Sequence, residues 1–333
     1  MDPNNIQLLF FGHIKNSLPP HLSLVDEIAE RLNISNDSAY RRIRGEKPIS
    51  FEELQVLCSH YKISLDQFLH LQTDAFIFSG ILQTESQTPF EDYLDYLLKS
   101  IQFMNSFKKR HVYFLMKDFP PFINFQITEL ATFKFYIWMK SILHYESLRG
   151  VKFELDDPRY VPFIDTSKKI IELYNKIPGT EIWNVESINS SLYQINFYRQ
   201  SGFFKNIKDV SLLYDKIEEL INHIEKQAEL GLKFNIGTTP GAGCGEYRMF
   251  VNELILGDNT VAAELDDIRV TFLNHSVLYA VRTTDKRFND AMFTNLDNLI
   301  KKSTMVSTIG ERERVIFFNQ LRYKINQYRA MLT

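Results

Sequence analysis

Cysteine is scarce in this chain and occurs only as Cys58 and Cys244. Two thiols cannot supply a disulfide framework, and the chain has no set of thiols at the spacing of a zinc site. Such usage is typical of proteins from a reducing compartment. We therefore expect a cytoplasmic protein with no structural metal site.

Long apolar runs are also missing. The most apolar later segment, residues 131–143, is shorter than a membrane span and contains Lys134 and Lys140. The first twenty residues begin acidic and have neither a basic stretch nor a small-residue cleavage site, so they do not resemble a signal peptide. We expect no transmembrane helix and no membrane partner.

Recognisable catalytic motifs are absent as well. The eight histidines are scattered, and the sequence contains no HExxH or GxSxG motif. Residues 235–247, NIGTTPGAGCGEY, are rich in glycine but lack the Lys-Ser/Thr of a phosphate-binding loop, and a predicted strand follows them. We expect a mobile loop there, and we predict neither enzymatic activity nor a cofactor.

Charge of one sign is not in excess, because the net charge is −3 over 333 residues. The field of the whole molecule would not attract nucleic acid, so any such contact requires a local basic patch. The length predicts two or three domains. Aromatic residues are plentiful, with 27 Phe and 16 Tyr, and they allow large hydrophobic cores.

Residues 1–72 contain five short segments with helical periodicity. The first, residues 4–17, ends before a pair of prolines, which lack the amide donor that a helix needs. Serines stand at the N-cap positions of the other four, at 23, 35, 50 and 64, and Glu53 completes a capping box with Ser50. The pattern predicts a small helical domain followed by a linker at 73–90.

Within residues 20–70, the string IAERLNISNDSAYRRIRGEKPISFEELQVLCSHYKISLDQFL closely resembles the Cro/cI-type (XRE) helix-turn-helix family. DSAYRRIRGE is similar to a string of its BetR-like branch. The resemblance implies a lambda-repressor-like five-helix DNA-binding domain. Asn33 stands where many members have glycine, and asparagine tolerates the left-handed conformation of the turn. A second departure is that Ile43, rather than residue 42, is expected to face the core beside Ala39.

The third segment, residues 36–44, corresponds to the recognition helix of this family. Outward residues of such a helix reach base edges, where asparagine suits adenine, arginine suits guanine and aspartate suits cytosine, while neighbouring residues hold phosphates. A solvated arginine face on a structural hairpin is the alternative. The candidates for base contacts are Asn36, Asp37, Tyr40, Arg41 and Arg44, and those for phosphate contacts are Arg42, Lys47, Ser23 and His21.

The charge of residues 1–72 weakens the case for DNA binding by a single copy. Seven Lys and Arg stand against nine Asp and Glu, a net charge of −2, although four of the positive charges lie within residues 41–47. A symmetric dimer doubles this patch across two half-sites. We therefore predict a homodimer bound to double-stranded DNA.

Residues 91–333 are predicted to form an effector and dimerisation domain, helical over 91–231 and α+β over 247–333. Residues 90–145 contain 15 aromatic residues. Within this segment, HVYFLMK is predicted to form a buried strand. Two interpretations remain open for them, a plain core or an aromatic-lined ligand pocket, and the core is favoured. From residue 248 the period changes to two, which predicts four short strands in an antiparallel meander and then two helices.

The longest predicted helix, about residues 207–230, carries apolar residues at alternating spacings of three and four. This seam suits the pairing of two subunits, but packing against the predicted helix 187–201 of the same chain suits it equally well. The seam consists of Ile207, Val210, Tyr214, Ile217, Ile221, Ile224 and Ala228.

Taken together, the patterns predict a mainly α protein with an α+β C-terminal part. Its expected function is that of a sequence-specific, DNA-binding transcription regulator. The 261 residues beyond the first 72 exceed what dimerisation requires, so we expect them to sense a small molecule or a protein partner. The alternative is an interaction protein that uses its helix-turn-helix to bind a protein instead of DNA.

Overall fold

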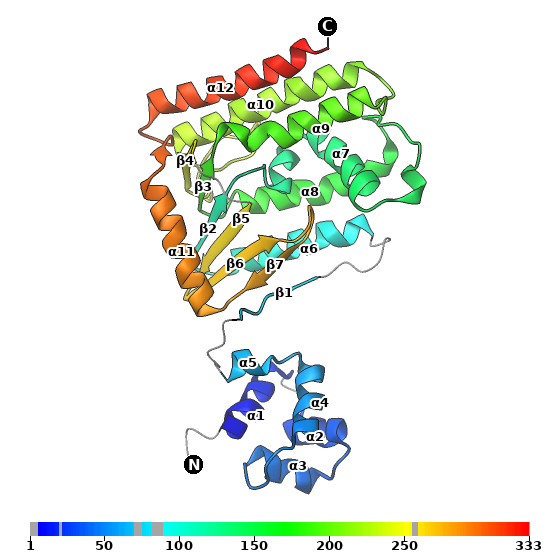
Figure 1. The fold of residues 1–333 in the computed structure, drawn as a ribbon, viewed down its shortest axis with the longest axis vertical. Coiled ribbons are helices and arrows are strands. Elements are labelled where there is room, and N and C mark those ends of the chain that lie inside the picture. Colours follow the sequence, from blue (N-terminus) through cyan, green and yellow to red (C-terminus); the bar gives the residue numbers. More distant parts are fainter. Residues whose placement is uncertain (1–5, 20–21, 70–74, 82–88, 255–258, 333) are drawn as a thin grey trace. The chain divides into compact units, whose positions relative to one another are not determined.

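The computed structural model describes residues 6–19, 22–69, 75–81, 89–254 and 259–332 (Figure 1). The chain divides into two compact units, Met1–Ile77 and Phe78–Thr333. The division falls inside the predicted linker 73–90. Its later part is not all linker, because Ser79–Gly80 forms a strand in the sheet of the second unit.

In the described residues of the first unit, all regular secondary structure is helical. Its N-caps are the predicted serines 23, 35 and 50, and Ser50 and Glu53 form the predicted capping box. The inward faces meet in a small core of seven buried apolar residues: Phe10, Phe11, Ile14, Ile28, Ala29, Ala39 and Leu57. The helices are α1 (Ile6–Ser17), α2 (Leu24–Leu32), α3 (Asn36–Ile43), α4 (Phe51–Tyr61) and α5 (Leu65–Phe68).

The second unit contains a mixed sheet, which in the described residues has eight strands in the order β1-β7-β6-β5-β2-β3-β4-β8. The three strands β2, β3 and β4 run parallel, and the other neighbours are antiparallel. The strands are β1 (Ser79–Gly80), β2 (Arg110–Leu115), β3 (Gly179–Trp183), β4 (Tyr247–Val251), β5 (Thr260–Leu265), β6 (Ile268–Asn274), β7 (Ala280–Thr283) and β8 (Thr304–Met305).

The predicted four-strand meander is wrong for its first strand. β5, β6 and β7 are successive antiparallel neighbours, but β4 lies beyond β2 and β3 and pairs parallel to β3. The long helical connection between β3 and β4 permits this parallel pairing, which a short turn cannot make. β2 is the predicted buried strand HVYFLMK, whereas β3 was not predicted; both join the strands of residues 247–333 in one sheet, so the predicted helical part and the α+β part share a single unit.

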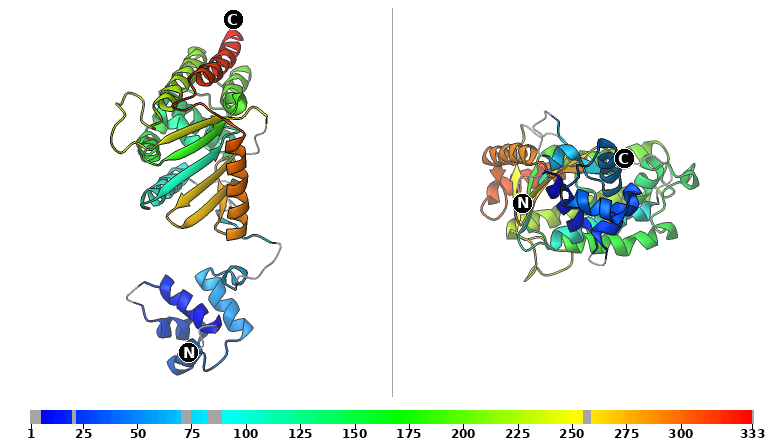
Figure 2. Two further views of the ribbon diagram at one scale, coloured as in Figure 1. Left: turned by 90° about the vertical axis from the view of Figure 1, so that its left-hand side faces the viewer. Right: turned by 90° about the horizontal axis from the view of Figure 1, so that it is seen from below.

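Helices cover both faces of this sheet. α11 packs on one face through Phe293 and Leu296, which contact Ala262 of β5. Figures 1 and 2 show α11 on one side of the strands and α6 and α8 on the other. The helices of this unit are α6 (Phe90–Asn105), α7 (Thr128–Ile137), α8 (Val161–Tyr174), α9 (Asn189–Gln200), α10 (Lys208–Leu230), α11 (Lys286–Lys301) and α12 (Glu311–Ala330).

The apolar seam of α10 is buried inside its own chain. Six of its seven residues are at most 3% exposed, and the exception is Ile207 at the start. α10 packs against α12, α9, α7 and β4. The intramolecular alternative is therefore correct, with α12 as a neighbour that the sequence did not predict, and this seam is closed to a second subunit.

Across the described residues, no helix combines the length and the apolar character needed to cross a membrane. The glycine-rich segment leads into β4 through turns, so no helix begins at its end. The protein is mainly α with an α+β part, as expected.

Candidate functional site

Helices α2 and α3 form a tight pair whose turn is stabilised by local backbone chemistry. Asn33 adopts the left-handed conformation, with φ 51° and ψ 50°, and the amide of Ile34 donates to the carbonyl of Ala29 over 3.0 Å. The Ser35 hydroxyl then accepts from the amide of Ser38 at the start of α3. These bonds set the angle at which α3 leaves the turn.

The outward face of α3 carries the five candidates for base contacts, and all five are exposed. The guanidinium of Arg44 lies 5.2 Å from the centre of the Tyr40 ring and 3.6 Å from the carboxylate of Glu46. Asn36 donates to the carboxylate of Asp26 over 2.9 Å, so it is tied to α2. Arg41 makes no ion pair with any described residue and is the least committed cation of this face.

The prediction that Arg42 contacts phosphate is wrong for this fold. Its side chain is 6% exposed and forms a two-pronged ion pair with Glu53 of α4, with Nε–Oε2 and Nη2–Oε1 distances of 2.8 and 2.6 Å. A third guanidinium bond goes to the carbonyl of Ser38. Arg42 therefore faces the interior and couples α3 to α4, while Ile43, expected to take the inner position, is only partly buried.

The chain after α3 is held by Gln7 of α1. Its side-chain nitrogen donates to the carbonyls of Arg42 and Lys47, and its oxygen accepts from the amide of Ile49. Sequence reasoning missed the role of Gln7 and the pairing of Glu53 with Arg42, because each links segments more than ten residues apart. Their positions leave Lys47 exposed.

The two remaining candidates for phosphate contacts precede α2. Ser23 is exposed and caps the helix by accepting from the amide of Asp26. His21 lies outside the described residues. Along the outward face of α3 and at its C-cap, therefore, amide, carboxylate, phenol and guanidinium groups are presented to solvent, a set that can read base edges.

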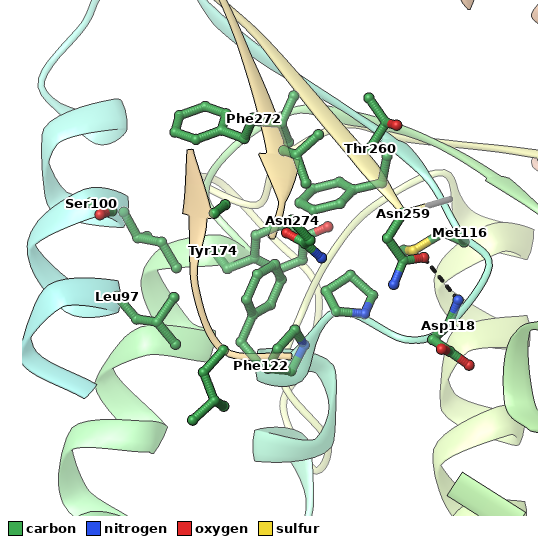
Figure 3. Close-up of a pocket in the computed structure, with 18 of the residues that line it drawn as sticks. Leu97, Ser100, Met116, Asp118, Phe122, Tyr174, Asn259, Thr260, Phe272 and Asn274 are labelled. Atoms are coloured by element: carbon green, nitrogen blue, oxygen red, sulfur yellow. Dashed lines mark hydrogen bonds between the residues drawn. The ribbon is translucent and has the colours of Figure 1, made fainter. Parts of the chain in front are cut away.

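The second unit contains a cavity of about 140 Å³. It is lined by α6, β2, the loop 116–122, the end of α8 and the strands β5 to β7, and Figure 3 shows part of this lining. Tyr93, Phe114 and Phe122 come from the aromatic segment, whose other residues are largely core. The favoured interpretation as a core is confirmed for most of the segment, and a few of its residues also form part of a cavity wall.

Few polar groups face this cavity. The amide of Asp118 donates to the side-chain oxygen of Asn259 over 2.9 Å, and burial raises the pKa of the Asp118 carboxyl while nearby Lys134 opposes the rise. Tyr93 is fully buried, its burial raises its pKa, and its hydroxyl has no hydrogen-bond partner in the described structure. A mostly apolar lining with a few polar groups is the usual composition of a small-molecule site.

A buried polar cluster beside the cavity carries a lysine. Glu181 accepts from Tyr174, Trp183 and Tyr247, and the ammonium of Lys233 lies 3.8 Å from the centre of the Tyr174 ring. The space beside it measures about 10 Å³, enough for at most one water. No group of three or more His, Cys, Asp or Glu within the described ranges could hold a metal ion.

No family of known proteins matches this chain, and neither the curated proteins nor the solved structures compared with it include a significant match. The features of the described structure that bear on its function are the outward face of α3 and the cavity of the second unit.

Proposed function

We propose that the protein is a sequence-specific, DNA-binding transcription regulator of the Cro/cI-type (XRE) helix-turn-helix family. In this proposal the first unit is a lambda-repressor-like domain, and α3 enters the major groove of double-stranded DNA. The observation that carries it is that some side chains of α3 face the core while others face solvent. Arg42 and Ala39 anchor the helix inward, while Arg41 and Arg44 remain exposed.

The roles within the site follow from these positions. Arg41 and Arg44 read guanine, whose two major-groove acceptors match the guanidinium fork. Asn36, Asp37 and Tyr40 supply the remaining contacts to bases. Lys47 and Ser23 hold phosphates, as does His21, and they set the register without reading sequence.

The active species is a cytoplasmic homodimer. A single first unit has a net charge of −2, so one copy gains little from the polyanion field, whereas two copies double the contacts of residues 41–47. The second unit dimerises and senses a small molecule or a protein partner. Its dimer surface is not the seam of α10, which is buried within the chain.

Selection from random double-stranded DNA tests the central claim. Full-length protein would be compared with Arg41→Ala plus Arg44→Ala over a salt series, with Lys15→Ala as a control on a different helix. Enrichment of a palindrome or a direct repeat that only the double variant loses is the expected result. If nothing is enriched at low salt, α3 does not read DNA.

One observation favours a second candidate function. The acidic balance of residues 1–72 suits a protein partner better than it suits a polyanion. In that case the helix-turn-helix binds a protein, and Arg41 and Arg44 are dispensable for the biological activity. Retention of that activity by the double variant would support this alternative over DNA binding.

A further inference from the structure

The cavity of the second unit has one polar end and one apolar end. Figure 3 shows Thr260, Asn259 and Asp118 at one end and Leu97 of α6 at the other. Ser100 also lies at the α6 end, but its hydroxyl donates to the carbonyl of Tyr96, so it offers no free donor there. A volume of about 140 Å³ resembles that of an apolar protein cavity of about 150 Å³ that binds benzene.

The lining excludes charged ligands. Among the described residues, the lining contains no lysine, arginine or histidine, so a ligand carboxylate would find no cationic partner there. Asp118 already lies in the field of Lys134 and Lys117, so a ligand cation would add a further positive charge. The cavity therefore suits an uncharged molecule.

One donor faces the cavity and a second is closed off within its lining, and an acceptor on the ligand would suit both. The Tyr93 side chain lines the cavity, but its hydroxyl is closed off from it and has no partner in the described residues, so this donor becomes available only when a ligand displaces the lining around it. The oxygen of the Asn259 amide is occupied by the Asp118 amide, which leaves its nitrogen as the donor that faces the cavity. A carbonyl oxygen can accept from such groups.

The same strands that line the cavity also hold the start of the second unit. Phe272 and Asn274 of β6 and Ala280 of β7 line it. On the neighbouring edge, Ser79 and Gly80 pair with β7, and Nε2 of His275 donates to the carbonyl of Ile81 over 3.2 Å. Residues 78–81 are therefore anchored on the β6–β7 hairpin and follow the helical unit in the chain.

Gly80 makes this anchorage close. A Cβ at this position would lie 3.0 Å from both the carbonyl oxygen of Ala280 and the Cα of Val281, so a larger residue would require β7 to move by a few tenths of an ångström. A shift of β7 around a ligand at Ala280 therefore reaches β1 directly.

We propose that this cavity binds a small, uncharged, largely apolar molecule with a carbonyl-type acceptor, and that the β6–β7 hairpin transmits its occupancy to residues 78–81. The effect on DNA binding rests on the proposed function, whereas ligand binding and the response of residues 78–81 do not. A ligand shifts this equilibrium only by as much as its affinity differs between the two states of the hairpin.

Four probes of nearly the same shape test the ligand class: acetophenone, ethylbenzene, benzoate and benzylamine. Calorimetric titration of the full chain should show saturable one-to-one binding of acetophenone. Ethylbenzene should bind about fivefold more weakly, because it cannot accept a hydrogen bond. Failure of acetophenone to bind, or tighter binding of benzoate or benzylamine, overturns the proposal.

A conservative pair of variants tests the role of the hydroxyl. Tyr93→Phe removes it without opening space, so the affinity for acetophenone should fall to that for ethylbenzene, and the affinity for ethylbenzene should be unchanged. Tyr214→Phe is the control, because this hydroxyl on α10 is also buried without a partner among the described residues, but its side chain is not part of the cavity lining. An unchanged Tyr93→Phe, or an equal loss in both variants, contradicts the assignment.

Hydrogen exchange on the full chain tests the transmission. Saturating acetophenone should change the protection of the amides of residues 79–81 and β7, and leave β8, at the opposite edge of the sheet, unchanged. No change at residues 79–81 with acetophenone bound overturns this step. DNA binding without probe binding counts against this inference alone, whereas probe binding without DNA binding counts against the proposed function alone.

Discussion

Arg41 and Arg42 are neighbours in sequence, but one side chain faces solvent and the other faces the interior. Replacing each one with alanine should therefore affect either DNA binding or stability, but not both. Arg42 is buried in its ion pair with Glu53, whereas Arg41 is exposed and has no ion pair in the described residues. We expect Arg42→Ala to destabilise the first unit. Arg41→Ala should leave its stability within about 0.5 kcal/mol and weaken DNA binding.

The size of the Arg42 effect follows from the burial of its partner. Removing one member of a buried ion pair typically costs about 3–5 kcal/mol, because the other charge is left without a partner. The Glu53 side chain is 20% exposed, so water reaches it and the expected loss is smaller, about 2–3 kcal/mol. For a domain of this size that corresponds to a fall in Tm of roughly 8–24 °C.

Hydrogen exchange of the α3 and α4 amides in the full chain measures this loss for the first unit alone. Trp138 and Trp183, the two tryptophans of the chain, both lie in the second unit. Their fluorescence therefore reports the unfolding of that unit, and the unfolding temperature it gives should equal the wild-type value in both variants. A double-mutant cycle with Glu53→Ala isolates the pair energy. Normal protection in Arg42→Ala, together with a loss of DNA binding equal to that of Arg41→Ala, would refute the inward role of Arg42.

Three further predictions concern the second unit. Ile221→Ala should lower its free energy of unfolding by about 2–5 kcal/mol in chemical denaturation and leave the oligomeric state unchanged by sedimentation, because the α10 seam is packed within the chain. Burial lowers the pKa of Lys134 and of Lys233 from 10.5 to about 8. Between these pH values the unfolded chain binds more protons than the folded chain, so the free energy of unfolding should rise from pH 8 toward pH 10. The rise should be less steep in Lys233→Met. Gly310→Ala should cost about 1–3 kcal/mol in the same denaturation assay, because its Cβ would overlap the carbonyl oxygen of Met305.

Each of these has an outcome that contradicts it. A dimer that dissociates in Ile221→Ala would return the seam to the subunit interface. Stability that is flat or falling from pH 8 to pH 10 in the wild type would mean that the two lysines are not held in a low-dielectric interior. An unchanged Gly310→Ala would mean that the turn after β8 has room for a side chain.

Local signals in the sequence were sufficient for the helix boundaries of the first unit. The serine caps at 23, 35 and 50 and the turn at Asn33 follow from interactions within three to five residues. The role of Arg42 could not be predicted in this way. α3 has only eight residues, and its helical periodicity does not reveal that a carboxylate on α4 forms an ion pair with residue 42. Long-range pairing decided which arginine turned inward.

The sheet shows the same limit. β3, GTEIW, has no alternation, because all five residues are buried and Glu181 is accommodated by donors from Tyr174 and Tyr247. Because the sequence does not reveal β3, the alternating pattern of β4 predicts an antiparallel meander with the strands that follow it. The parallel pairing of β4 with β3 cannot be predicted from that pattern. The aromatic density of residues 90–145 did indicate a core or a pocket, but only the arrangement of α6, β2 and the strands β5 to β7 around one another decides where a cavity remains.

The specificity ratio of charge-preserving variants tests most directly whether α3 reads bases. Arg41→Lys and Arg44→Lys keep the positive charge but lose the planar fork that pairs with guanine. With the selected site and the same site changed at one guanine, we predict that the wild-type affinity ratio of roughly 5- to 150-fold falls toward one in at least one variant, while affinity for unrelated DNA is retained. An unchanged ratio in both variants would contradict base reading by this helix.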